Sequence, residues 1–205
     1  PWTTTLPTAR TPSTRQYNSE DLDIQTRFVP VQRFSKWTFD DPSIRKWAEE
    51  HLEGRVLNAC AGQNHLNHDD EIIRNDINPN RDADLHVDVG ELAAHLEKES
   101  FSTILFDPPW SLYQSNLRYD GNHVTKGTNT DIDLSKLPFD IPEGREKTQL
   151  GHARLAKENF NYLLKPGGTV LQLTFHGTCM PSRLGYKRLE RAIFDPVGEG
   201  KSVIG

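Results

Sequence analysis

The sequence FSTILFDPPW spans residues 101–110 and changes character in its middle. Its first residues form a short apolar run of the kind found in buried strands. Each proline lacks an N–H group and cannot continue a central strand, so the strand is expected to end at Asp107. An acid, a rigid turn and a large aromatic are therefore expected at the carboxyl end of a strand, where open α/β sheets bind their ligands.

The rest of the chain predicts strands that alternate with helices. Apolar runs bounded by turn residues predict strands at 55–60, 72–77, 85–89, 169–175 and 201–204. Helical periodicity and capping signals predict helices at 42–52, 91–98, 149–164 and 186–194. Asp41 is the expected N-cap of the first helix, and Gly54 its stop. This alternation predicts an α/β fold with a mostly parallel, doubly wound sheet.

The DPPW tetrad resembles the D-P-P-W/Y motif of methyltransferases that use S-adenosyl-L-methionine (SAM) to methylate exocyclic amino groups of nucleic-acid bases. The order of elements, with a KPGG turn at 165–168, resembles the class I (Rossmann-like) methyltransferase fold from about residue 40 onwards. That resemblance implies a Rossmann-like sheet with SAM as the cofactor. A full member has seven strands and this chain reaches about the sixth, so truncated C-terminal strands are one expectation and a shortened fold is the other.

The expected catalytic residues are Asp107, Pro108, Pro109 and Trp110. Proline fixes its own φ and keeps the preceding residue extended, so the Asp107 carboxylate and the Pro108 carbonyl are held in place. Two such acceptors could bind both N–H groups of a base amine and localise its lone pair. Trp110 would stack against the base, as in flipped-base pockets. The alternative is a plain strand-ending turn with a core tryptophan.

The resemblance assigns the cofactor to the ends of the first three strands. In the family the first strand runs into an acid-x-G-x-G loop, and the corresponding positions here are Asn58, Cys60 and Gly62. Only the last glycine is kept, and a core strand with a small-residue turn explains that stretch almost as well. Asp76, after the second strand, is expected to take the ribose hydroxyls. Asp88, after the third, is expected to face the adenine amino group.

The first crossover between strands is short. Only nine residues separate Gly62 from Ile72, whereas a crossover with a helix normally needs ten or more. The usual first helix is therefore expected to be reduced to a turn or lost. The loop contains Gln63, Asn64, His65 and His68, which could hold the carboxylate of SAM. A zinc site with Cys60 is disfavoured because no cysteine pair lies nearby, so no metal is expected.

Length and composition limit the class of protein. The 205 residues fit a methyltransferase domain at 40–205 behind a flexible arm at 1–39. Within the domain, the polar stretch 111–144 is expected to face the substrate, with Tyr113 and Arg118 as contacts. The sequence has no apolar run of membrane-span length and only two cysteines, which favours a cytoplasmic protein with no membrane partner.

The net charge of −5 is unevenly distributed. The stretch 41–110 carries most of the acidic residues, whereas 151–205 is basic. The basic stretch includes Arg183, Lys187, Arg188 and Arg191. These four side chains form either a phosphate-facing patch or the solvated face of one helix.

The leading hypothesis is an N-methyltransferase for a nucleic-acid base, most readily adenine N6 of DNA or RNA, with cytosine N4 left open. The tryptophan form of the tetrad is typical of messenger-RNA adenosine methyltransferases and of some phage-type DNA adenine methyltransferases. A partner subunit or homodimer could complete target recognition. One alternative, favoured by the acidic net charge, is a methyltransferase for a small molecule or protein. The other, favoured by the degenerate glycine loop, is a catalytically inactive partner subunit.

Overall fold

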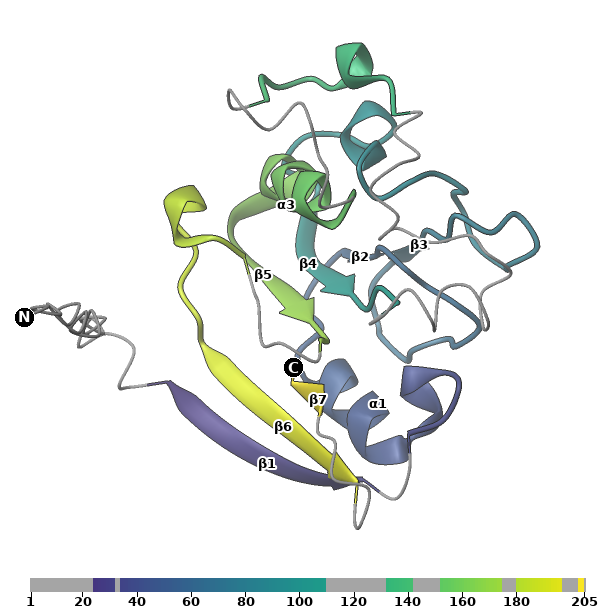
Figure 1. Cartoon of the computed structure of the whole chain (residues 1–205), viewed down its shortest axis with the longest axis vertical. Helices are drawn as coiled ribbons and strands as arrows, with labels where there is room; N and C mark the ends of the chain where they lie inside the picture. Colours follow the sequence, from purple (N-terminus) through teal and green to yellow (C-terminus); the bar gives the residue numbers. More distant parts are fainter. Residues whose placement is uncertain are drawn as a thin grey trace, which may run out of the picture.

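The computed structural model describes residues 24–31, 34–109, 132–141, 152–174, 180–196 and 203–204. These residues form an α/β fold with two sheets, in which all neighbouring strands but one pair are parallel. Figure 1 shows the four-stranded sheet in the centre, with α3 on one side and α1 near the second sheet. None of the described helices is long and apolar enough to cross a membrane.

The first sheet has the strand order β3-β2-β4-β5, with every pair parallel. Its strands are β2 (Val56–Asn58), β3 (Ile72–Arg74), β4 (Phe101–Phe106) and β5 (Leu164–Gln172). The four strands predicted at these places are confirmed, and β4 ends directly before Asp107 as expected. Because the strands are parallel, the loops that follow β2, β3 and β4 leave the sheet at one edge.

The strand predicted at 85–89 is reduced to a single parallel bridge between Asn75 and Leu85. A side chain replaces the missing strand pairing. The Asn75 amide donates to the Val87 carbonyl at 3.0 Å and accepts from the Val87 N–H at 3.1 Å. The segment is thus held beside β3 without a strand ladder.

The second sheet contains β1 (Gln25–Val31), β6 (Glu190–Pro196) and β7 (Val203–Ile204). Residues 25–31, expected in the flexible arm, instead pair with β6 in parallel. The helix predicted at 186–194 is wrong, because β6 occupies 190–196. Burial alternates along this strand, with Ala192 and Phe194 in the core. A period of two therefore governs the segment once β1 supplies a partner. The strand expected at 201–204 is confirmed only in its last part.

The predicted first helix is confirmed as α1 (Pro42–Glu50). The Asp41 carboxylate accepts hydrogen bonds from the backbone N–H groups of Ser43 and Ile44, at 2.8 and 3.2 Å, which is the expected N-cap. Gly54 follows with φ +54°, and an added Cβ there would lie 2.6 Å from the Ser102 hydroxyl oxygen. A glycine is therefore required where the chain turns into β2.

The helix predicted at 149–164 is confirmed as α3 (His152–Leu163), and the turn at 165–168 becomes an irregularity within β5. The helix predicted at 91–98 is wrong, because only a single 3-10 turn forms at Leu92–Ala94. The buried Asn159 amide of α3 accepts from the Ala93 N–H and donates to the Gly90 carbonyl. These bonds fix the segment by tertiary contact rather than by helix formation.

The two faces of the first sheet pack against different elements. On one face, α1 and the second sheet form a core with Val56, Leu105 and Leu171. On the other face, α3 packs on Leu57 and Ile104. The expected substrate loop 111–144 is described only over 132–141, where Leu137 lies in a small cluster with Leu155 and Ala93.

We expect Phe194→Ala to destabilise the protein by about 3–5 kcal/mol, because it empties a fully buried position. The Phe194 ring packs edge-on against Trp47 at 5.3 Å and joins β6 to α1. The matched control is Phe28→Ala on β1, whose residue is 72% exposed and pairs with Ile193 of the same sheet. Urea unfolding measures both, and equal losses for the two variants would contradict this core.

Candidate functional site

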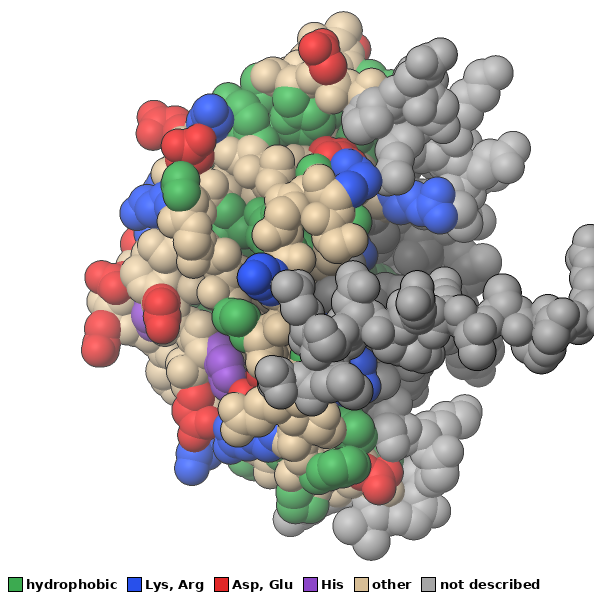
Figure 2. Space-filling model, turned by 90° about the vertical axis from the view of Figure 1, so that its left-hand side faces the viewer, with side chains coloured by type: hydrophobic (Ala, Val, Ile, Leu, Met, Phe, Trp, Pro, Cys, Tyr) green, Lys and Arg blue, Asp and Glu red, His purple; other side chains and the backbone are tan. Residues whose placement is uncertain are grey.

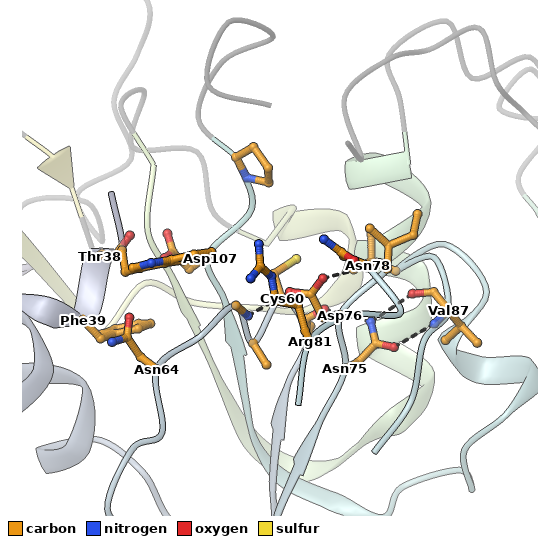
Figure 3. Close-up of a pocket in the computed structure, with 17 residues that line it drawn as sticks. Thr38, Phe39, Cys60, Asn64, Asn75, Asp76, Asn78, Arg81, Val87 and Asp107 are labelled. Carbon is orange, nitrogen blue, oxygen red and sulfur yellow. Dashed lines mark hydrogen bonds between the residues drawn. The ribbon is translucent and has the colours of Figure 1, made fainter. Parts of the chain in front are cut away.

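A pocket opens at the carboxyl edge of the first sheet, between the loops that follow β2, β3 and β4. The segment 37–39, directly before α1, forms part of the same lining. Figure 3 shows Cys60, Asp76 and Arg81 in the middle of the site, with Thr38, Phe39 and Asn64 to one side. The opposite side carries Asn78 and Val87.

The structure brings five of the predicted site residues together in this lining. They are Cys60, Gly62, Asp76, Asp107 and Pro109. Three others are neighbours in the chain but are not part of the lining, namely Asn58, Asp88 and Pro108. The predicted Trp110, Tyr113 and Arg118 lie outside the described residues.

The Asp76 carboxylate joins two walls of the pocket. Its Oδ2 accepts from the Gly62 N–H at 2.9 Å, and its Oδ1 accepts from the Asn78 N–H at 2.8 Å. A carboxylate has about four acceptor positions, so two remain for a ligand. Asp76 can therefore hold the loops and still accept from a pair of hydroxyl groups.

Gly62 occupies a position that no other residue fits well. Its φ is +57°, and an added Cβ would lie 3.1 Å from the Trp37 ring. The left-handed conformation favours glycine, and a side chain here would also crowd the Trp37 ring. The glycine that the sequence resemblance singles out is thus the one that packs under the pocket wall.

The first crossover has no helix over residues 63–71, as the sequence predicted. The Arg74 guanidinium instead binds backbone carbonyls of this loop and of the loop after β3. It donates to the Asn64 carbonyl at 2.6 Å, to the Gly62 carbonyl at 3.3 Å and to the Asp82 carbonyl at 2.9 Å. Burial lowers the pKa of Arg74, and the nearby carboxylates of Asp82, Asp84 and Asp76 oppose that shift.

Asn75 fixes the back of the pocket. Its side chain is fully buried and donates to the Ala59 carbonyl at 3.0 Å, in addition to its two bonds with Val87. The loops after β2 and β3 and the segment at 85–89 are therefore joined through one amide.

Asn58 and Asp88 are both buried beside the pocket. Asn58 is 1% exposed, and its Oδ1 has no hydrogen-bond partner among the described residues. Asp88 is 8% exposed and accepts from the Gly90 N–H at 2.8 Å, while its neighbours Val87 and Val89 line the pocket. The position of Asp88 thus gives it a turn-forming contact.

Burial raises the pKa of the Cys60 thiol well above its ordinary value, and the carboxylates of Asp76, Asp107 and Asp88 raise it further. The thiol is therefore neutral at physiological pH. Of the loop histidines, His65 faces the Asp82 carboxylate and His68 contacts the Gly54 carbonyl. Within the described ranges, no group of three or more His, Cys, Asp and Glu is placed to hold a metal ion.

The basic residues near the C-terminus do not lie on one helix. Arg183 pairs with Glu158 of α3, and the segment from 185 to 189 is irregular before β6 begins. Lys187, Arg188 and Arg191 line a separate groove between β5 and the start of β6. On the face drawn in Figure 2, basic side chains are interspersed with acidic ones.

The sequence did not predict that residues 37–39, directly before α1, form one wall of the pocket. Ser35 donates to the Asp40 carboxylate at 2.8 Å, and Asn64 donates to the other oxygen of that carboxylate at 2.9 Å. These bonds hold Trp37 and Phe39 against the pocket. Two aromatic residues just before a helix N-cap were the available signal. Arg81 and Asn78 were missed as well, although they follow Asp76 closely.

Comparisons with protein-family models, curated proteins and solved structures found no match to this chain.

We expect Asn75→Ala to destabilise the protein by about 2 kcal/mol or more. The substitution leaves buried backbone groups of Ala59 and Val87 unpaired, at about 1–3 kcal/mol for each group that water cannot reach. The matched control is Asn80→Ala, because that residue is exposed. Urea denaturation gives both values, and a neutral Asn75→Ala would show that the amide does not hold the pocket together.

We expect iodoacetamide to alkylate Cys60 at pH 8 more slowly than an unperturbed thiol, because its pKa is raised. A raised pKa leaves less thiolate at any given pH, so the rate should rise only at higher pH. Asp76→Asn removes one of the causes of the shift and should speed the reaction. Peptide mass spectrometry follows the residue, with urea-unfolded protein as the control, and equal rates in the folded and unfolded protein would contradict the shift.

Proposed function

We propose that this chain is a SAM-dependent methyltransferase that modifies an exocyclic amino group of a nucleic-acid base, with adenine N6 as the first candidate. One observation carries the proposal. Gly62, Asp76 and Asp107, which the family resemblance selects from three separate strands, line the same pocket. The parallel strands bring the loops after β2, β3 and β4 to this edge in any case, so the support comes from the residue types found there, a glycine and two aspartates.

The strand order supports the same proposal. With the bridge at Leu85, the parallel order is Leu85-β3-β2-β4-β5. This corresponds to the 3-2-1-4-5 order of Rossmann-like doubly wound sheets, which bind ligands at their carboxyl edge. We therefore include a Rossmann-like methyltransferase fold in the proposal.

When bound, SAM supplies a methyl group activated by a sulfonium. The Asp107 carboxylate would accept one N–H of the base amine, and the Pro108 carbonyl would accept the other. These bonds direct the nitrogen lone pair and stabilise positive charge as the nitrogen becomes alkylated. In this proposal Asp107 also takes the released proton. Pro109 keeps the two acceptors rigid, so the protein contributes mainly by positioning.

The charges around the pocket suit a cationic cofactor. The carboxylates of Asp76, Asp107 and Asp88 all act electrostatically on Cys60. A sulfonium near that thiol would experience the same negative potential favourably. Target recognition is assigned to residues 111–144 or to a partner subunit, and the proposed site of action is the cytoplasm.

The test is methyl transfer from deuterium-labelled SAM to unmethylated DNA and to RNA, followed by mass spectrometry of the digested nucleosides. We expect labelled N6-methyladenine in one polymer. Asp107→Ala should lower its formation by about a hundredfold or more, because a group that binds and deprotonates the amine is lost.

The matched control is Asp69→Ala, which removes an exposed aspartate outside the pocket lining and should keep full activity. Calorimetry with SAM separates binding from transfer. If SAM binds but neither polymer is modified, base methylation is contradicted and small substrates become the next candidates. If SAM does not bind, the cofactor assignment itself is wrong.

A further inference from the structure

Arg81 is the single cationic residue among the described residues that line the pocket. The other charged lining residues are Asp76 and Asp107. The two carboxylates therefore repel an anionic group that enters the pocket, and the Arg81 guanidinium attracts it. Figure 3 shows Arg81 beside Asp76 and Cys60.

The position of Arg81 is fixed from two sides. Its backbone N–H donates to the Asn78 carbonyl at 3.1 Å, which attaches it to the turn that Asp76 closes. Its guanidinium carbon lies 4.9 Å from the centre of the Trp37 ring. Stacking on an aromatic face orients the planar guanidinium while leaving its edge N–H donors available.

The Trp37 ring is itself held in place. It packs against Gly62, and the backbone N–H of Trp37 donates to the Ser35 hydroxyl at 3.1 Å, which fixes the main chain that carries the ring. Arg81 forms no salt bridge with any carboxylate of the described residues. The pocket thus contains a guanidinium, that of Arg81, which is oriented by the Trp37 ring close to Gly62.

We propose that Arg81 binds the carboxylate of the amino-acid end of the cofactor, an inference that rests on the proposed function. That end of SAM carries a carboxylate and an ammonium group. Arginine pairs with a carboxylate through two parallel N–H donors, and this geometry fits its fork. The amino-acid end then lies at the wall formed by Trp37 and Gly62, and the nucleoside end extends towards Val87 and Asn75.

The test compares two ligands by calorimetry. S-adenosylhomocysteine carries the amino-acid end, whereas 5′-methylthioadenosine keeps the nucleoside and the sulfur but lacks that end. Arg81→Ala should weaken the affinity for S-adenosylhomocysteine by about tenfold to a hundredfold, the range for a lost charge-assisted contact. The affinity of the same variant for 5′-methylthioadenosine should stay within about threefold of the parent value. Arg81→Lys should restore part of the preference, because it returns the charge without the fork.

Lys36→Ala is the matched control. The Lys36 ammonium lies 5.0 Å from the centre of the same Trp37 ring, but Lys36 is not part of the pocket lining. Its loss should leave both affinities unchanged. The inference is overturned if Arg81→Ala weakens the binding of both ligands equally or weakens the binding of neither. If the parent protein binds neither ligand, the proposed function fails together with it, and this result is distinct from a loss of preference.

Discussion

The loop that follows β2 has no helix to satisfy its backbone groups, and three consecutive side chains at the end of β3 satisfy them instead. Arg74 binds the carbonyls of Gly62 and Asn64, Asn75 binds the Ala59 carbonyl, and Asp76 binds the Gly62 N–H. Buried polar groups of a backbone must be paired, so the short crossover depends on these side chains. The end of β3 therefore stabilises the loop after β2 as well as its own loop, and these two loops form walls of the pocket.

The residues of the site differ in how much they contribute to the stability of the fold and how much to the proposed binding and catalysis. Asp76 holds two turns and is also the proposed partner of the ribose, so its removal would disturb the fold and the ligand together. Arg74 has a buried charge whose partners are mostly carbonyls, and removing it would leave several acceptors unpaired. Asp107 and Arg81 also line the pocket, and in the proposal they contact the substrate amine and the cofactor directly. They therefore report on binding and chemistry more directly.

The sequence predicted those elements whose signals are local. β4 and its end at Asp107 follow from an apolar run stopped by prolines, and α1 follows from the Asp41 cap. The failures are segments defined by distant partners. β6 forms because β1 pairs with it, and the segment at 92–94 is held by Asn159 from α3. Helical or strand periodicity over eight or nine residues cannot reveal such partners.

The same distinction explains the site. Gly62, Asp76 and Asp107 were predictable because each follows a recognisable strand, whereas the contact between Trp37 and Arg81 joins segments about forty residues apart. The charge pattern also becomes clear only in the fold. Asn58 stands at the position where the resemblance would place an acid, and at 1% exposure a charged side chain there would carry a large desolvation cost. Asp76 and Asp107, which are less buried, supply negative charge to the pocket, and Arg81 supplies its positive charge. A zwitterionic and cationic ligand can then be oriented by charge alone, without an acid in the first strand.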